Sequence, residues 1–327
     1  MVDLPVLSKG VPGCAGPAPG DGRKPDWLRV RAPGGDNYTM IKRTLRERGL
    51  FTVCEEAQCP NVGECWGGGT ATFMLLGEMC TRGCRFCAVT TGNPGGWVDR
   101  DEPRKLAESV ALMGLKYIVL TMVDRDDLPD GGAEHVSECI EHLKTTEPEL
   151  IVEALVGDFA GNRSAIDAVV ESGMDVFAHN IETVSRLERS VRDARCGYEQ
   201  TLDVLRHAKA HQLAPYTKSS IMLGLGESHE EVLQTMQDLR AADVDFLTLG
   251  QYLQPSHRHL DVQEWVHPER FDALREAGEE MGFRYVAAGP LVRSSYRAGE
   301  FFIESLVRKR RAEVAPSSEE AAWGANC

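Results

Sequence analysis

The sequence predicts an α/β protein in which parallel strands alternate with helices. Short β-branched and apolar runs recur roughly every 25–35 residues, and amphipathic helical stretches separate them. A full eight-unit barrel needs about 250 residues, and the chain between its two tails has room for six or seven units. The expected strands are Thr72–Leu76, Tyr117–Thr121, Ile151–Leu155, Val176–His179, Lys218–Leu223, Phe246–Gly250 and Arg284–Ala287.

The helical stretches carry start and stop signals. Ser228-His229-Glu230-Glu231 is a capping box, in which the serine and a glutamate satisfy exposed backbone N–H groups. The apolar residues after it follow one helical face: Val232, Leu233, Met236 and Leu239. Gly173 and Gly282 stand where helices should end before a new strand.

The two ends of the chain differ from this pattern. Residues 1–38 begin with a Gly- and Pro-rich stretch, which cannot form a packed core and is expected to be a flexible arm. From about Pro316 the tail is again small and polar. We expect neither end to carry chemistry.

Charge and hydropathy limit the function classes. A formal net charge of −14 disfavours nucleic-acid binding, because neutralising phosphates requires Lys and Arg. The one concentrated basic run, Arg308–Arg311, is either a helix end stabilised by the helix dipole or a dock for an acidic carrier protein. No apolar stretch approaches the roughly 18 residues that span a bilayer, and no secretory signal is evident. We expect a cytoplasmic protein without membrane or nucleic-acid partners.

Cys80, Cys84 and Cys87 form a C-x3-C-x2-C loop. Three thiolates on one loop can hold three irons of a [4Fe–4S] cluster, which normally takes four cysteines, and the fourth iron is then open to a ligand. Zinc is the alternative, but structural zinc sites need a fourth Cys or His at comparable spacing, and none is present. The loop therefore predicts an iron–sulfur cluster.

Cys54, Cys59 and Cys65 form a second set with C-x4-C-x5-C spacing. The alternative is a group of buried thiols, since free Cys is among the most buried residue types. Six cysteines in one short stretch argue against it, because the other four are scattered: Cys14, Cys139, Cys196 and Cys327. We therefore expect a second [4Fe–4S] cluster.

The C-x3-C-x2-C loop, with Phe86 beside its last cysteine, resembles the cluster loop of the radical S-adenosylmethionine (SAM) enzymes. The resemblance implies that the open iron binds S-adenosylmethionine and that the reduced cluster cleaves it to a 5′-deoxyadenosyl radical. Phe86 is expected to contact the cofactor. A difficult C–H abstraction is thus handed to a cofactor, which the protein binds, orients and shields.

Both cysteine sets together resemble the lipoyl synthase family. The resemblance extends over roughly residues 39–299 and includes Gly69–Gly77, Asp130–Ala133, His179–Val184, Thr217–Glu227, Gly250–Ser256 and Arg293–Tyr296. It implies a partial (βα)6 TIM-type barrel of the radical SAM kind over residues 70–290. The auxiliary cluster is expected on an N-terminal extension over residues 39–69 and a C-terminal segment over residues 291–327.

Further site residues follow from the resemblance. Gly131 and Gly132 are expected to hold the methionyl amino group, although a Gly pair is also common in ordinary turns. His179, Asn180 and Glu182 follow the fourth expected strand and could hydrogen-bond the ribose or methionyl portion of the cofactor, with a structural role as the alternative. Gln251 and Tyr252 follow the sixth strand. A serine is implied as the fourth ligand of the auxiliary cluster: Ser295, with Ser294 as the possible substitute. Arg293 would hold substrate or cluster.

The implied reaction inserts two sulfur atoms, taken from the auxiliary cluster, at C6 and C8 of an octanoyl chain. That chain is linked to a lysine of a carrier protein, either an E2 domain of a 2-oxoacid dehydrogenase or the H protein of glycine cleavage. An electron donor such as flavodoxin or ferredoxin and an iron–sulfur cluster carrier are also implied. Two departures from the family stand at Gly157, where a proline is expected, and around Asp261.

Two other functions remain open. A radical methylthiotransferase acting on tRNA would be expected to carry a basic RNA-binding domain, which this sequence lacks. A non-catalytic zinc-binding protein would contain zinc without iron or acid-labile sulfide.

Overall fold

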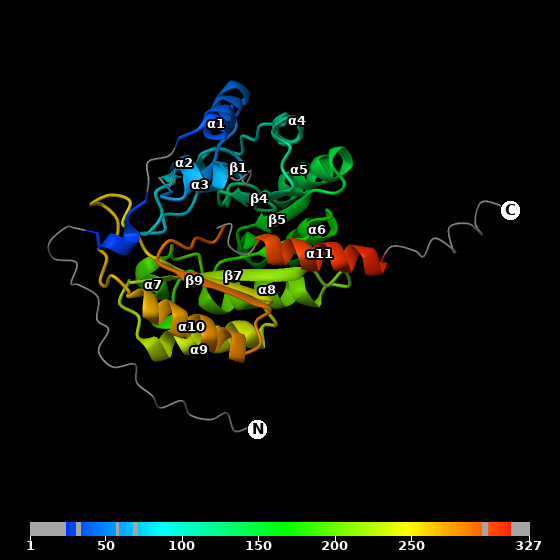
Figure 1. The fold of residues 1–327 in the computed structure, drawn as a ribbon. Coiled ribbons are helices and arrows are strands. Elements are labelled where there is room, and N and C mark those ends of the chain that lie inside the picture. Colours follow the sequence, from blue (N-terminus) through cyan, green and yellow to red (C-terminus); the bar gives the residue numbers. More distant parts are fainter. Residues whose placement is uncertain (1–23, 31–33, 57–58, 68–70, 296–299, 315–327) are drawn as a thin grey trace.

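The computed structural model describes residues 24–30, 34–56, 59–67, 71–295 and 300–314 of the 327-residue chain. Its main sheet has seven strands in sequence order, with β1 and β9 at its edges (Figure 1). Every neighbouring pair is parallel. The strands are β1 (Ala71–Leu75), β4 (Tyr117–Met122), β5 (Ile151–Leu155), β6 (Val176–Ala178), β7 (Tyr216–Leu223), β8 (Phe246–Gln251) and β9 (Tyr285–Gly289).

Parallel neighbours need crossover connections, and helices provide them here. The crossover helices are α4 (Glu102–Met113), α5 (Ala133–Thr146), α6 (Arg163–Glu171), α8 (Tyr198–Ala210), α9 (His229–Ala241) and α10 (Pro268–Glu280). They complete six strand–helix units, and β9 follows as a seventh strand. The partial (βα)6 barrel is confirmed, and each strand boundary lies within two residues of the expected one.

The local signals in the sequence are also confirmed. Ser228 and Glu231 form the expected capping box at the start of α9. The side chains on the expected face of α9 pack in a core with α10 and β8. Gly173 and Gly282 follow α6 and α10 with φ of 94° and 90°, a left-handed conformation that glycine adopts without strain.

Helix α11 (Glu300–Val314) packs at the amino-terminal end of the barrel. Its Ile303 and Val307 lie in one apolar cluster with Tyr117, Ile151 and Phe246, which come from three strands. In Figure 1 this helix lies beside β7 and α8. The helix therefore covers the barrel opening opposite the carboxyl ends of the strands.

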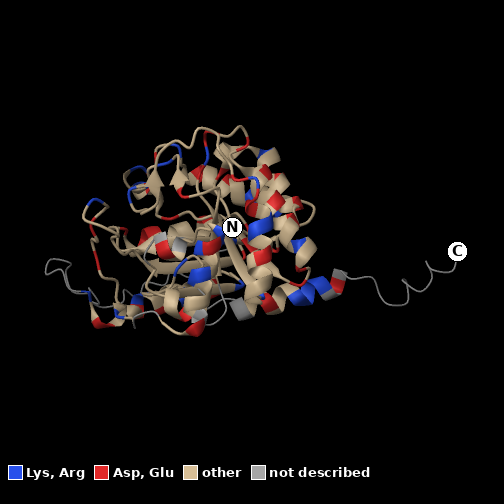
Figure 2. Ribbon diagram, turned by 90° about the horizontal axis from the view of Figure 1, so that it is seen from above, with Lys and Arg blue, Asp and Glu red and all other residues tan. Residues whose placement is uncertain are grey.

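The basic run at the end of α11 binds the barrel itself. Arg311 pairs with Asp175 at 2.8 Å and donates to the Leu150 carbonyl at 3.0 Å. Arg310 donates to the carbonyls of Leu213 and Ala214. Figure 2 shows Lys and Arg gathered on the helix nearest the C-terminus, whereas elsewhere both signs are mixed. These contacts favour a structural role for the run over a carrier dock.

The N-terminal extension packs beside β1. It holds α1 (Asp36–Arg48), α2 (Val53–Glu56) and α3 (Val62–Gly67). Ile41, Leu45 and Trp66 are buried in one core with Phe73 of β1. Thr52 donates to the Thr72 carbonyl at 2.6 Å. The extension is thus joined to the barrel by apolar packing and by backbone contacts.

The predicted arm over residues 1–38 contains residues that pack on the barrel. A 3-10 helix spans Asp26–Leu28, and Trp27 and Leu28 pack in a cluster with Tyr252 and Trp265. Helix α1 begins at Asp36. The prediction of a flexible arm was therefore wrong for residues 26–28 and 36–38, because Trp27 and Leu28 pack against apolar side chains and α1 begins at Asp36.

Shorter elements complete the description. A two-stranded parallel sheet joins β2 (Met79–Cys80) to β3 (Thr90–Thr91). A 3-10 helix spans Phe159–Gly161, another spans Ser185–Leu187, and α7 covers Glu188–Val191. No helix in the part of the chain that the structure describes is both long and apolar enough to cross a membrane.

Candidate active site

A cavity of about 520 Å³ opens at the carboxyl ends of the strands, within the usual size range of ligand sites. Thr121, Leu155 and Ser220, at or near the ends of three different strands, contribute to its wall. In parallel barrels, active sites lie at this end. The wall also contains cysteines from both predicted sets: Cys54, Cys59, Cys80, Cys84 and Cys87. Folding therefore brings Cys54 and Cys59 of one set to the same cavity as all three cysteines of the other.

The cluster loop over residues 80–87 is anchored at its base. The short sheet pairs Cys80 with Thr91, and the Cys87 N–H donates to the Cys84 carbonyl at 3.1 Å. Backbone N–H groups also reach the sulfurs: Arg82 N–H to Cys80 Sγ at 3.4 Å, and Asp193 N–H to Cys84 Sγ at 3.3 Å. Donors at the sulfurs suit thiolates that carry negative charge.

Arg82 ties this loop to the barrel. Its guanidinium is buried and makes two bonds of 2.7 Å to the Asp158 carboxylate and one of 2.8 Å to Asp126. Burial raises the pKa of Asp158, but the hydrogen bonds from Arg82, the nearby charges of His179 and Arg82 and the Ala160 N–H together outweigh it and lower that pKa to about 2. The pair is therefore ionised at neutral pH and holds the loop against the ends of β4 and β5.

The thiols of the loop are suited to a metal. Burial, with the charge of Asp124 nearby, raises the pKa of Cys80 to about 11, and burial also raises that of Cys87. Without a cation these groups stay protonated, whereas bound iron deprotonates its cysteine ligands. Three convergent soft donors with N–H groups at their sulfurs fit an iron–sulfur cluster.

The second set meets the C-terminal segment. Cys54 and Cys59 lie in the cavity wall with Arg293, Ser294 and Ser295, and the Cys59 N–H donates to the Cys54 carbonyl at 3.0 Å. Burial raises the pKa of both thiols. Cys54 and Cys65 are equally buried in the same core, each 7% exposed, but Cys65 is not among the described residues of the wall.

Arg293 has a free hydrogen-bond donor beside Cys59. Its Nη1 donates to the Val292 carbonyl at 2.6 Å, while its buried Nη2 has no hydrogen-bond partner among the described residues. Its charge acts on the Cys59 thiol. A buried donor without a partner is costly, and an anionic group held by the thiols would satisfy it. Two thiols, two hydroxyls and this cation fit a second cluster, apart from the position of Cys65.

The polar residues after β6 divide into two groups. Asn180 and Glu182 line the cavity, and the Asn180 amide donates to Glu182 Oε1 at 3.1 Å. Glu182 has φ of 68°, and burial raises the pKa of its carboxyl. Both ring nitrogens of His179, by contrast, are hydrogen-bonded, one to the Val156 carbonyl and the other to the Thr201 hydroxyl. Asn180 and Glu182 can therefore contact a polar ligand, while His179 supports the wall.

Gln251, Tyr252 and Phe86 also line the cavity. The Gln251 side-chain amide donates hydrogen bonds to three backbone carbonyls, and the Tyr252 hydroxyl donates to the Leu260 carbonyl at 2.8 Å. Phe86 packs in the cluster that contains Tyr252 and Trp27. The first two residues thus shape the wall, and Phe86 offers an apolar ring.

Gly131 and Gly132 are not among the described residues that line the cavity. Both have positive φ, and a Cβ on Gly132 would stand 2.4 Å from Leu76 Cδ1. A Cβ on Gly131 would lie 3.1 Å from Phe159 Cδ1. Close packing at the ends of two strands therefore favours glycine at both positions.

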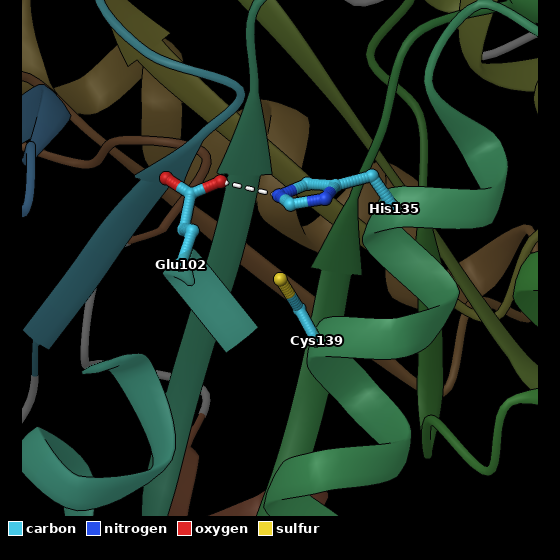
Figure 3. Close-up of side chains that lie close together, drawn as sticks. All are labelled: Glu102, His135 and Cys139. Carbon is cyan, nitrogen blue, oxygen red and sulfur yellow. Dashed lines mark hydrogen bonds and ion pairs between the residues drawn. The ribbon is translucent and has the colours of Figure 1, made fainter. Parts of the chain in front are cut away.

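A buried, hydrogen-bonded group of three side chains lies beside Leu76, just after the end of β1 (Figure 3). Glu102 accepts from the Leu76 N–H at 3.0 Å and bonds His135 Nε2 at 2.6 Å, and Cys139 lies nearby. These three are metal-ligating residue types, but the carboxylate oxygen that faces His135 already has two partners. The group links β1 to α5.

Other wall and loop residues were missed by the sequence analysis. His259 Nε2 bonds the Cys87 carbonyl at 2.9 Å, and Lys24 from the predicted arm lines the cavity. Cys196 also lies in the wall. No local spacing links any of these three residues to the cysteine sets.

The two departures from the family have local partners. A Cβ on Gly157 would stand 2.4 Å from Asp124 Oδ1, so glycine permits this carboxylate to approach. Asp261 accepts from the Gln254 amide at 3.0 Å within the loop after β8. Gly157 thus lines the cavity itself, whereas Asp261 contacts it through Gln254, which is part of the wall.

An open parallel barrel with a three-cysteine loop at the carboxyl ends of its strands defines a radical SAM enzyme. The sequence model described as the radical SAM superfamily matches residues 74–239. A second, described as the N-terminal domain of lipoyl synthase, matches residues 19–59.

The chain belongs to the lipoyl synthase family. It is 61% identical to "Lipoyl synthase" of Ectopseudomonas mendocina, over 85% of this chain and 80% of that protein. It is 56% identical to "Lipoyl synthase 2, chloroplastic" of Oryza sativa subsp. indica, over 96% and 86%. It is 55% identical to "Lipoyl synthase, mitochondrial" of Rattus norvegicus, over 89% and 80%. The chain is accordingly a sulfur-inserting radical SAM enzyme.

Solved structures agree on the fold. Methylornithine synthase (PylB) superposes with a TM-score of 0.53 at 14% identity, over 89% of this chain and 97% of that one. The hydrogenase maturase HydG superposes with a TM-score of 0.52 at 13% identity, over 66% and 50%.

Proposed function

We propose that this enzyme inserts two sulfur atoms at C6 and C8 of an octanoyl group linked to a lysine of a lipoyl-carrier protein. The observation that carries the proposal is the shared cavity, where Cys54 and Cys59 of the extension meet Cys80, Cys84 and Cys87 of the barrel. A sulfur source beside the site of hydrogen abstraction is what this reaction needs, because close approach lowers the barrier.

Cys80, Cys84 and Cys87 would hold the [4Fe–4S] cluster that binds S-adenosylmethionine. Cys54, Cys59, Cys65 and Ser295 would hold a second, auxiliary [4Fe–4S] cluster. Ser294 adjoins Ser295 and is the alternative ligand. When bound, the first cluster and S-adenosylmethionine supply homolytic C–H cleavage, and the second supplies sulfur.

The other residues of the wall bind, orient and exclude water. Asn180 and Glu182 are the proposed contacts for the polar part of S-adenosylmethionine, and Phe86 for an apolar face. Arg293 is proposed to direct its free Nη2 at the auxiliary cluster or the substrate by a charge-assisted hydrogen bond. Arg82 keeps the cluster loop in place through its buried bonds to Asp126 and Asp158. Gly131 and Gly132 are proposed to approach the methionyl amino group with their backbone, and packing against Phe159 and Leu76 would fix their position.

Partners follow from the reaction. The proposed substrates are octanoylated E2 domains of 2-oxoacid dehydrogenases and the octanoylated H protein of glycine cleavage. An electron donor of the flavodoxin or ferredoxin kind would reduce the first cluster, and a cluster carrier would rebuild the second. Relatives named chloroplastic and mitochondrial share the family, so the cytoplasmic location stays a prediction that rests on the bacterial relatives.

Mass spectrometry of an octanoyl-lysine peptide tests the proposal. The peptide is incubated anaerobically with reconstituted enzyme, reductant and S-adenosylmethionine. We expect a product in which two hydrogens are replaced by two sulfurs. Formation of 5′-deoxyadenosine without any gain of sulfur would contradict lipoyl synthesis. Zinc in place of iron and acid-labile sulfide would contradict the radical chemistry altogether.

A further inference from the structure

Four exposed cations at the entrance of the cavity have no part in the proposed mechanism. We call them the mouth cations: Lys24, Arg85, Arg189 and Arg258. Lys24 is itself part of the cavity wall, and Arg85 adjoins Phe86 of the wall. Arg258 follows the wall residue Pro255 by three positions. Exposed side chains in or beside the wall lie where the cavity meets the solvent.

Hydrogen bonds hold three segments of the chain together around Arg85. The Arg85 guanidinium donates to the Ser190 carbonyl at 3.0 Å, and Arg189 is the neighbour of that residue. The Arg85 carbonyl accepts from the Leu260 N–H at 3.2 Å, two positions beyond Arg258. The loops after β6 and β8 therefore bring their cations to the cluster loop, although they are distant from it in the sequence.

The mouth cations differ from their neighbours in having no carboxylate partner. None of them forms an ion pair within the described part of the chain. Nearby, Arg186 pairs with Glu231 at 2.5 Å, and Arg195 pairs with Asp193 at 2.9 Å. Acidic residues outnumber basic ones in the chain, 50 to 36, so a carboxylate of the chain itself would be the ordinary partner. The positive charge at the mouth is instead open to another molecule.

The octanoyl chain must enter this cavity, so the carrier protein has to lie against the mouth. The basic run of α11 cannot provide that dock, because it lies at the opposite end of the barrel and Arg311 is paired with Asp175. Exposed charges around a binding site attract partners of the opposite sign and speed their association. Charge at the mouth thus selects a carrier with an acidic face.

We infer that the mouth cations form the docking surface for the carrier protein and contact acidic side chains beside its octanoyl-lysine. The inference rests on the proposed function, which supplies the carrier as substrate. It adds the sign of the charge on the partner and the residues of the enzyme that receive it.

Steady-state kinetics with two substrates test the inference. One substrate is an octanoylated carrier domain, and the other is a short octanoyl-lysine peptide without acidic residues. Dithionite is the reductant for both, so that no protein electron donor is present. The variants are Arg189→Glu, Arg258→Glu and the two combined. The matched control is Lys116→Glu, which makes the same change of charge at an exposed residue before β4, at the opposite end of the barrel.

We expect the double variant to lower kcat/KM for the carrier domain roughly tenfold, mainly through KM, because charges at the rim of an interface act on association. The peptide should react as with wild type, and Lys116→Glu should change neither substrate. The Kd of a fluorescently labelled carrier domain should rise with the KM. Equal carrier kinetics in the double variant and Lys116→Glu would overturn the inference. So would equal losses on carrier and peptide, which would mean a damaged cavity.

A salt titration of the wild-type enzyme needs no variant. Raising the ionic strength from about 0.01 M to about 0.15 M shortens the Debye length from about 30 Å to about 8 Å. The kcat/KM for the carrier domain should fall over this range, while that for the peptide stays constant. A carrier rate that does not respond to salt would contradict an electrostatic dock.

A protein electron donor is the other occupant that such a surface could receive. The same assays are therefore repeated with reduced flavodoxin in place of dithionite. A defect of the double variant that appears only with flavodoxin would assign the mouth cations to the electron donor and overturn the inference.

The peptide separates the two levels of argument. If the wild-type enzyme inserts no sulfur into the peptide, the proposed function fails. If it converts the peptide while the double variant binds and converts the carrier domain normally, only the inference about the mouth cations fails.

Discussion

The two cysteine sets lie on one cavity but are held in different ways. The loop over residues 80–87 is paired with β3 and anchored by the buried Arg82–Asp158 pair, which belongs to the barrel itself. The other set combines Cys54 and Cys59 of the N-terminal extension with Ser295 from beyond β9. Two of its thiols are in the wall, while Cys65 is buried in the core. The first site is built into the barrel, whereas the second is assembled from its flanks.

This difference agrees with two roles. A cofactor that is used again in every turnover needs a loop that keeps its geometry, and buried charged hydrogen bonds supply that rigidity. A group that is consumed must be released and replaced, and a site assembled from two flanking segments of the chain is easier to open. Variants in the two regions should therefore fail in different ways.

The largest expected effect comes from Cys84→Ala. The barrel site loses a ligand at its best-anchored position, so both 5′-deoxyadenosine and the dithiol product should fall to background. Liquid chromatography of the nucleoside and mass spectrometry of the peptide measure the two. Undiminished 5′-deoxyadenosine would remove Cys84 from the ligand set.

Cys59→Ala should separate the two functions. The barrel loop is unchanged, so cleavage of S-adenosylmethionine continues, but no sulfur enters the octanoyl peptide because the donor cluster lacks a ligand. The same two assays apply. Sulfur-containing product from this variant would exclude the extension as the sulfur source.

Arg82→Met should test the anchoring of the barrel site as a change in stability. Removing one partner of a buried ion pair leaves Asp158 unpaired and costs about 3–5 kcal/mol of unfolding free energy. The matched control is Arg195→Met, because the Arg195 side chain is 49% exposed and pairs with Asp126 at the surface. Its loss should cost at most about 1 kcal/mol. Denaturant unfolding of cluster-free protein measures both, and equal losses would refute the anchoring role of Arg82.

The smallest expected effect is a pH dependence of the same anchor. The pKa of Asp158 is lowered from 3.8 to about 2, so its stabilisation is complete above pH 4 and is lost as the pH falls toward 2. The loss amounts to roughly 2 kcal/mol at the acid end. Asp124 affects the unfolding free energy in the opposite direction, because burial raises its pKa to about 6. Its contribution changes only above about pH 4, outside the range in which Asp158 titrates.

Unfolding measured between pH 4 and pH 2 checks this dependence. The wild-type protein should lose stability steeply in this range, and Arg82→Met should lose less because its Asp158 lacks the hydrogen bonds and the charge of the Arg82 guanidinium. Parallel slopes in the two proteins would mean that the Arg82 bonds do not depress the pKa of Asp158.

The fold was largely predictable, since its signals are local. Strand runs such as Ile151–Leu155 and the capping box at Ser228 depend on residues within a few positions of each other. The C-x3-C-x2-C spacing predicts a cluster loop for the same reason. The Gly131–Gly132 pair was harder to interpret, because a turn glycine looks alike in sequence whether it faces a ligand or, as here, the side chains of Leu76 and Phe159.

The sequence by itself determined the order of strands and helices and the two cysteine spacings, because periodicity, capping and loop length act over short stretches. Only the tertiary structure decided that Cys54 and Cys59 share one cavity with the cluster loop, that Arg82 is bound by Asp158, and that the Asp193 N–H donates to Cys84 Sγ. These contacts join residues separated by whole strand–helix units. Their pairing depends on how the parallel strands stack side by side, which brings the carboxyl ends of distant strands to one edge of the barrel.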